Sequence, residues 1–83
     1  MNNDPAIPIN ETPGREPVSI CLNGLPFEVP AGCTVSQLLG LAQIRDKLVA
    51  VEVNGEVIPK SQHSQHCLQP SDQVEVVTLV GGG

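Results

Sequence analysis

Aromatic residues are almost absent from this chain of 83 residues, which has one Phe, Phe27, and neither Trp nor Tyr. Single-stranded nucleic acids are commonly bound by stacking their bases on aromatic rings, and this chain offers no such platform. Basic residues are scarce as well, because four Lys and Arg stand against nine Asp and Glu, giving a formal net charge of −5 at pH 7. Such a charge opposes a phosphate backbone and an anionic membrane surface. We therefore expect neither nucleic acid nor a membrane among its partners.

Long apolar runs and paired cysteines are also lacking. No stretch approaches the roughly 20 apolar residues that cross a bilayer, and the first residues show neither the basic nor the apolar region of a signal peptide. The expected location is the cytosol. The three cysteines, Cys21, Cys33 and Cys67, are odd in number and form no C-x-x-C motif. This argues against a disulfide framework and against a structural zinc site, so we expect free thiols.

Composition divides the chain into an arm, one domain and a tail. Residues 1–16 are rich in proline and polar side chains, and such a segment buries too little apolar surface to offset its ordering entropy. We predict a disordered arm at residues 1–16, a domain at residues 17–80 and a flexible glycine tail at residues 81–83. A chain of this size has room for one domain, so a separate catalytic domain is not expected.

Two runs of alternating apolar residues predict the beginning of a sheet. Residues 18–22 and 48–53 have the period of two that is typical of strands, and each run is followed by an Asn-Gly pair. Asn-Gly favours the positive φ angles of a type I′ turn between antiparallel strands. We therefore expect residues 25–29 and 56–58 to be the return strands of two hairpins. The polar run that follows, up to His66, is expected to be a loop with one helical turn.

The last strand is predicted at residues 72–80 by the same alternation. The residues expected on its inward face are Val74, Val76 and Thr78. The residues expected on its outward face are Glu75, Val77 and Leu79. Because no second layer of so small a chain remains to cover that outward face, Val77 and Leu79 should form an exposed apolar patch at which a partner docks.

One amphipathic helix is predicted from Thr34 to Ala42. Its apolar residues recur at helical spacing, and Gln37 stands three residues after Thr34, as in a capping box. Cys33 precedes the cap and is expected to act as a hydrophobic staple. These elements predict an α+β fold, a mixed sheet of four or five strands with one main helix on one face. The predicted core consists of Ile20, Leu22, Val35, Leu38, Leu39, Val51, Val53, Val74 and Val76.

Candidate catalytic and metal-binding residues are few. His63, His66 and Cys67 have an H-x-x-H-C spacing, but zinc needs a third or fourth ligand and none stands nearby in the sequence. The alternative is a polar loop with Cys67 and Leu68 packed against the core. No Ser, Cys or Lys nucleophile is accompanied by a base and an orienting group. We expect no metal, no bound cofactor and no enzymatic activity of the chain itself.

Three glycines, Gly81, Gly82 and Gly83, directly follow the last predicted strand. A frayed terminus is one explanation. The functional alternative is a tail that extends about 10 Å from a rigid domain and, lacking Cβ atoms, threads a narrow channel. A carboxylate at Gly83 is a poor electrophile until a partner converts it to an acyl-adenylate. Sulfur can then replace AMP and give a thiocarboxylate.

Residues 51–60 (VEVNGEVIPK) and 72–83 (DQVEVVTLVGGG), with the helix start at residues 34–39, resemble the ubiquitin-like sulfur carrier proteins of the β-grasp fold. Within them they are most similar to the ThiS-type carriers of bacterial thiamine thiazole synthesis. The resemblance spans residues 18–83. The chain lacks the aromatic and proline residues that typically precede Gly-Gly in molybdopterin carriers, and the lysine-rich surface of ubiquitin. The arm at residues 1–16 departs from the family, which usually begins directly with the first strand.

The resemblance implies a cycle of activation and transfer at Gly83. An E1-like ATP-dependent adenylyltransferase would activate its carboxylate, and a cysteine-desulfurase persulfide or another persulfide donor would supply sulfur. The resulting thiocarboxylate would deliver that sulfur to thiazole synthase, while ATP is used by the activating partner. The alternatives are a sulfur carrier for molybdopterin or another metabolite, a ubiquitin-like modifier that forms isopeptide bonds, and an interaction module with an incidental glycine tail.

Overall fold

A computed structural model of the chain describes residues 16–79. The predictions made for residues 1–15 and 80–83, which include most of the arm and Gly81, Gly82 and Gly83, lie outside this range. The described elements, in chain order, are β1 (Val18–Leu22), β2 (Leu25–Val29), α1 (Val35–Leu41), β3 (Val49–Val53), β4 (Glu56–Val57), the 3₁₀ turn η2 (Lys60–Gln62) and β5 (Gln73–Thr78). The predicted order of strands and helix is confirmed.

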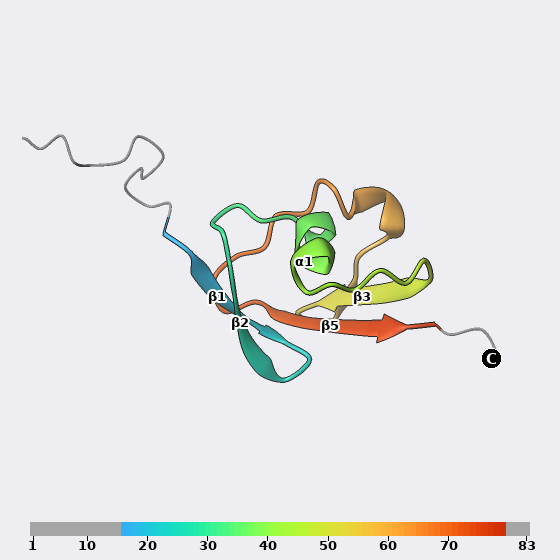
Figure 1. The fold of residues 1–83 in the computed structure, drawn as a ribbon, viewed down its shortest axis with the longest axis horizontal. Coiled ribbons are helices and arrows are strands. Elements are labelled where there is room, and N and C mark those ends of the chain that lie inside the picture. The colour runs from blue at the N-terminus through green and yellow to red at the C-terminus, as the bar shows by residue number, and fades with distance from the viewer. Residues whose placement is uncertain (1–15, 80–83) are drawn as a thin grey trace, which may run out of the picture.

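The strands form one mixed sheet in the order β2-β1-β5-β3-β4 (Figure 1). The two hairpins, β1 with β2 and β3 with β4, are antiparallel, and β5 lies between them. It runs parallel to β1 and antiparallel to β3. At the hairpin turns Asn23 and Asn54 have φ angles of 50° and 54°, and the glycine after each is also at positive φ. The Asn-Gly prediction is thus confirmed at both turns.

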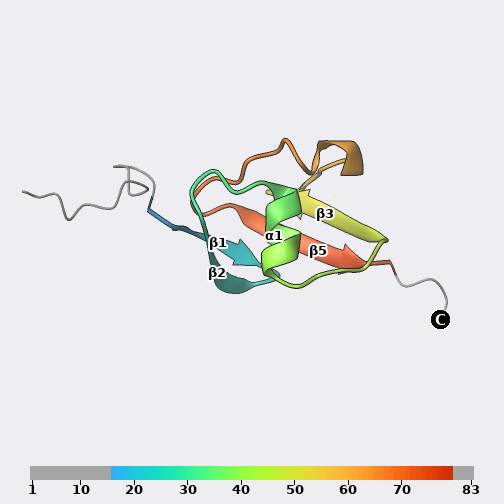
Figure 2. The same cartoon turned by 45° about the horizontal axis from the view of Figure 1, so that its top comes forward.

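Helix α1 crosses one face of the sheet (Figure 2), and its start has the predicted capping box. The Gln37 backbone N–H donates to Thr34 Oγ1 over 3.1 Å, and the Thr34 N–H donates to Gln37 Oε1 over 2.9 Å. These two bonds satisfy N–H groups that a helix start would otherwise leave without partners. The sequence therefore sets where α1 begins.

The loop after β4 holds the same helix end from the outside. The Val35 N–H donates to the His66 carbonyl over 3.0 Å, and the Ser36 N–H donates to the His63 carbonyl over 2.9 Å. A helix of two turns is not stable by itself in water, so contacts from the rest of the fold must maintain it. This loop therefore belongs to the helix-bearing layer of the domain.

The core lies between α1 and the sheet. All predicted core residues are buried except Leu22 and Leu39, which are partly buried and pack against the core. Cys33 is buried in the same cluster as Leu38, as expected of a staple that precedes the cap. The buried apolar residues that were not predicted to be in the core are Val29 and Ile58.

Two predictions are wrong, and a third holds only in part. Thr78 lies on the inward face of the sheet, opposite Val49, which packs against the core, but the Thr78 side chain is exposed. Cys67 is exposed, whereas Leu68 is buried as expected. Cys67 forms an isolated antiparallel bridge with Thr34, and alternation along this short extended segment turns Leu68 inward and Cys67 outward. Ile58 lies beyond the end of β4, although its side chain is buried.

Replacing Leu38, which is fully buried, tests this packing. Leu38→Ala should lower the free energy of unfolding by about 2–5 kcal/mol, because it leaves a cavity under α1. Leu41 is half exposed on the same helix, so the matched variant Leu41→Ala should cost much less. Urea denaturation followed by circular dichroism measures both. Equal losses in the two variants would contradict the placement of the core.

Candidate functional site

The histidine and cysteine motif does not form a metal site. Within residues 16–79, no group of three or more His, Cys, Asp or Glu side chains is placed to hold an ion. His63 is buried, and its Nε2 lies 3.0 Å from the Ile58 carbonyl oxygen, which ties that ring nitrogen to the backbone. Cys67 is exposed. His63 and Cys67 therefore lie in different surroundings, one buried and one exposed, and do not act as a pair of ligands.

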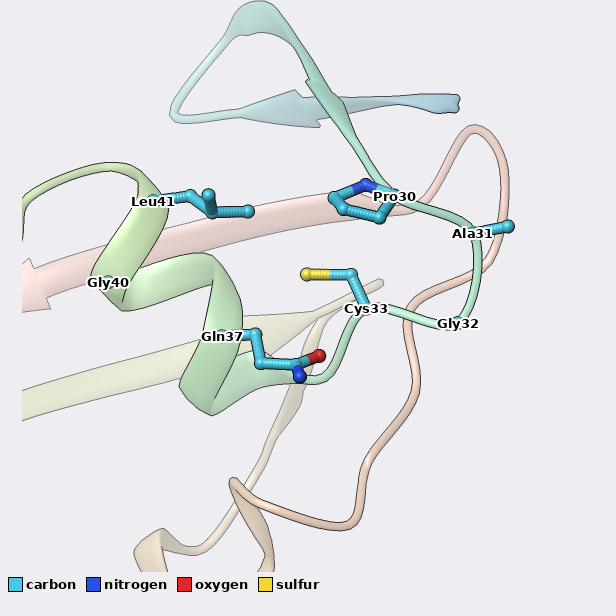
Figure 3. Close-up of a pocket in the computed structure, with 7 residues that line it drawn as sticks. All are labelled: Pro30, Ala31, Gly32, Cys33, Gln37, Gly40 and Leu41. Carbon is cyan, nitrogen blue, oxygen red and sulfur yellow. The ribbon is translucent and has the colours of Figure 1, made fainter. Parts of the chain in front are cut away.

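A hollow beside the start of α1 was the next candidate (Figure 3). It is lined by Pro30, Ala31, Gly32, Cys33, Gln37, Gly40 and Leu41. Burial, together with the nearby Cys67 thiol, raises the pKa of the Cys33 thiol, and its Sγ donates to the Thr34 carbonyl over 3.3 Å. A thiol with a raised pKa is a poor nucleophile at neutral pH. The hollow is therefore lined mainly by apolar groups, and its one thiol is not activated.

The remaining candidate is the end of β5, where the chain leaves the domain toward the glycines. Asn23, in the first hairpin turn, holds this strand from one side. Its Oδ1 accepts from the Val76 N–H over 2.7 Å, its Nδ2 donates to the Val76 carbonyl over 3.3 Å, and its own N–H donates to the Val74 carbonyl over 2.8 Å. One turn residue thus makes three bonds to the backbone of β5.

Asn54, in the second hairpin turn, holds the start of β5 from the other side. Its N–H donates to the Gln73 carbonyl over 2.7 Å, and its Oδ1 accepts from the Gln73 N–H over 2.9 Å. Its Nδ2 donates to Asp72 Oδ1 over 3.0 Å, and Asp72 Oδ2 accepts from the Gln69 N–H. We call Asn23 and Asn54 the asparagine clamp. The position and direction of β5 depend on both turns.

The outward face of β5 is apolar near its end. Val77 is 54% exposed and Leu79 is 51% exposed, as the alternation predicted. Ala50 lies directly opposite Val77 on β3, and the Leu79 N–H donates to the Leu48 carbonyl over 2.7 Å. Leu48 is itself 60% exposed. We call these four residues the apolar patch, and it lies where the chain continues toward Gly81, Gly82 and Gly83.

Known proteins resemble this chain in sequence and fold. The sequence model described as the ThiS family matches residues 20–83. The protein named sulfur carrier protein ThiS from Escherichia coli is 30% identical over 66 residues, which cover 80% of this chain and 100% of that protein. A crystal structure titled thiamine biosynthesis protein (ThiS) from Geobacter metallireducens has a TM-score of 0.70 and 29% identity, covering 80% of this chain and 100% of that one.

A second kind of relative is much longer than this chain. A protein named thiazole synthase from Paramagnetospirillum magneticum is 36% identical over 66 residues. The matched residues are 80% of this chain but only 20% of that protein. A thiazole synthase from Magnetococcus marinus shows the same proportions at 43% identity. The chain therefore corresponds to about a fifth of these proteins.

The five-stranded mixed sheet with one helix and its structural neighbour define a ubiquitin-like β-grasp domain, as the sequence predicted. Because the family match covers most of the sequence, the chain belongs to the ThiS family. Within the described part of the chain, no helix is both long and apolar enough to span a membrane.

The asparagine clamp can be tested at Asn23, where glycine would keep the positive φ angle and remove only the side chain. Asn23→Gly should lower the free energy of unfolding by about 1–2 kcal/mol through the loss of the hydrogen bonds to Val76. Gln43, which follows α1, has a φ of 60°, and Gln43→Gly serves as the matched control. That change should be neutral or slightly stabilising, since glycine is favoured just after a helix. Urea denaturation of both variants provides the comparison, and an Asn23→Gly variant as stable as the control would contradict the clamp.

Proposed function

We propose that this chain is a sulfur carrier of thiamine biosynthesis whose Gly83 carboxylate is converted to a thiocarboxylate. The observation that carries the proposal is the placement of the glycines in a ThiS-family domain. Leu79 is fixed to the sheet by its hydrogen bond to Leu48, and the glycines begin two residues later, at Gly81. A short tail that leaves a rigid strand carries its end group at a limited distance from the domain.

The chemistry proposed for Gly83 begins with activation. The carboxylate attacks the α-phosphorus of ATP in an E1-like adenylyltransferase, which forms an acyl-adenylate and releases pyrophosphate. A persulfide, as a cysteine desulfurase provides, then attacks the acyl carbon and expels AMP. A thiol reduces the remaining S–S bond and frees the thiocarboxylate. In this cycle the partner enzymes carry out each step on the Gly83 carboxylate, and the chain is their protein co-substrate.

Thiazole synthase is the sulfur acceptor that we propose. The support is that two relatives with this name contain a segment similar to the chain, and that the family model and the Escherichia coli relative are those of ThiS. A carrier for molybdopterin would use the same chemistry at Gly83 with other partners. The acceptor is therefore tested separately from the chemistry, by supplying purified thiocarboxylate to each synthase.

The apolar patch is the proposed docking surface for the adenylyltransferase. Its side chains are exposed beside the exit of the tail, so a partner that covers them would receive the tail in a defined direction. Val77→Asp combined with Leu79→Asp should leave the fold intact and weaken binding to that enzyme by tenfold or more, because charge replaces the central apolar contacts. Isothermal titration measures the affinity, and circular dichroism verifies the fold.

A matched control for this pair uses two leucines elsewhere in the domain with similar exposure. Leu25 is 68% exposed at the first hairpin and Leu41 is 50% exposed at the end of α1. Leu25→Asp combined with Leu41→Asp changes the net charge equally and should leave the affinity unchanged. If both pairs weaken binding alike, the apolar patch is not the docking surface.

The reach of the tail can be tested at Gly83 itself. Deleting Gly83 leaves Gly82 as the terminal carboxylate, drawn back by roughly 3.5 Å. Because a misplacement of about 1 Å can cost on the order of a hundredfold in rate, ATP–pyrophosphate exchange with the cognate adenylyltransferase should nearly cease. Gly82→Val should also reduce exchange, since the added side chain obstructs a narrow channel. Equal exchange by all three proteins would show that the glycines are an incidental terminus.

Intact-mass analysis of the chain purified from its native cell distinguishes the remaining alternatives. Replacement of one oxygen by one sulfur at the terminus supports the carrier. Conjugates that survive denaturing gels would instead identify a ubiquitin-like modifier. An unchanged terminus in actively growing cells would favour an interaction module and overturn the proposal.

A further inference from the structure

An apolar groove lies beside α1 on the helix-bearing side of the sheet. The hollow of Figure 3, in which the side chain of Leu41 points toward Pro30, adjoins a second hollow that the same two residues also line. Pro17, Glu28 and Val29 complete the second hollow. The two have volumes of about 530 and 300 Å³, within the range of roughly 300–1,000 Å³ that ligand pockets have. We call the two hollows together the helix groove.

The floor of the helix groove includes a glycine inside α1. Gly40 lines the first hollow. Apart from its chain neighbours and the backbone of its own helix, no atom of residues 16–79 lies within 4 Å of the position that a Cβ atom would take there. A glycine in a helix is destabilising relative to alanine, and packing within these residues gives no reason for it. A segment that lies close against the backbone of α1 does give one, because it needs the room that a side chain would fill.

The arm at residues 1–16 joins the domain at one end of this groove. Pro17 lines the second hollow, and the next residue, Val18, pairs with Val29. Ile9 stands eight residues before Pro17, and eight extended residues span roughly 26–29 Å. The seven residues of α1 span only about 10 Å. The arm is therefore long enough to turn back and cover the groove.

The sequence of the arm is suited to an apolar groove at one place. Ile7 and Ile9 are the large aliphatic residues of positions 2–16. Pro8 between them disfavours helical backbone at Ile7, and side chains two residues apart in an extended segment point to the same side. The Pro-Gly pair at positions 13–14 is typical of turns. The arm thus combines an apolar edge with a signal for the reversal that brings this edge back to the domain.

We propose that residues 7–9 of the arm bind in the helix groove of the same chain, with the two isoleucines against Leu41 and the backbone close to Gly40. This occupant is apolar, tethered beside the groove and favoured in an extended form by its proline, so it loses little freedom on binding. The proposal narrows the expectation of a disordered arm to the residues on either side of this segment. Because the apolar patch lies on the other face of the sheet, the bound arm leaves it uncovered. The inference does not depend on the chemistry proposed for Gly83.

The first test removes the apolar side chains of the arm. Ile7→Ser combined with Ile9→Ser should lower the melting temperature of the full chain by about 4–8 °C, because the groove loses its apolar contacts. Asn3→Ser combined with Asn10→Ser is the matched control in the arm and should leave the melting temperature unchanged. Circular dichroism follows both. An unchanged melting temperature in the isoleucine variant, or an equal loss in the control, overturns the inference.

The second test places a side chain in the floor of the groove. In the isoleucine variant, Gly40→Ala should raise the melting temperature by about 2–8 °C, because alanine favours the helix and its Cβ atom meets open space. In the wild-type background the same change should bring no increase, because the added atom displaces the bound arm. An equal increase in both backgrounds would show that nothing lies over Gly40, and this too overturns the inference.

Methyl NMR locates the arm directly. In a full chain with labelled Ile and Leu methyl groups, nuclear Overhauser contacts are expected between Ile7 or Ile9 and Leu41, with equal strength in dilute and concentrated samples. Contacts that arise only between labelled and unlabelled molecules would place the arm on a second copy of the chain. Contacts with Leu79 instead would place it over the apolar patch. Either of these results, or the absence of any contact, overturns the inference.

Discussion

The hydrogen bonds of β5 to both hairpin turns determine how the rest of the domain is arranged. Neither hairpin shares an edge with the other, because β1 and β3 are separated by β5 in the sheet. Asn23 and Asn54 bond to the backbone of this strand from opposite hairpins. The backbone of each asparagine has the left-handed conformation that a tight hairpin turn needs. Each residue therefore forms its turn and also bonds that turn to β5. The direction in which the chain leaves the domain after Leu79 follows from them.

Much of the fold could be predicted because its elements are locally specified. The alternation of Val18 and Ile20, the Asn-Gly pairs, and the capping box of Thr34 and Gln37 each involve residues close in sequence. The wrong predictions concern residues whose burial depends on contacts between distant parts of the chain. Leu68 and Cys67 are adjacent and both apolar in character, and only the bridge between Cys67 and Thr34 shows which of them turns inward. His63 is buried in a polar run because its ring bonds to the Ile58 carbonyl, which no periodicity indicates.

The candidate site shows the same division. The exposure of Val77 and Leu79 could be predicted from the sequence. The alternation along the last strand puts both residues on its outward face, and so small a chain has no second layer to cover that face. The residues beside them could not be predicted. Ala50, Leu48 and Glu52 come from β3 or the residue before it, and their position next to β5 depends on the register between two segments far apart in the chain. Gly81, Gly82 and Gly83 lie within the residues that the ThiS family model matches, and this match depends on the sequence alone.

The central position of β5 has a consequence for biosynthesis. While the chain is being made, residues 18–58 can form two separate hairpins, but the strand that joins them is translated last among the described elements. Contacts between segments so far apart form slowly, because the intervening chain must first be ordered. Val77 and Glu75 reach the same face as Ala50 and Glu52 only when that closure is complete. An enzyme that recognises this face would distinguish finished molecules from nascent ones, and would engage the tail only of a domain that has folded.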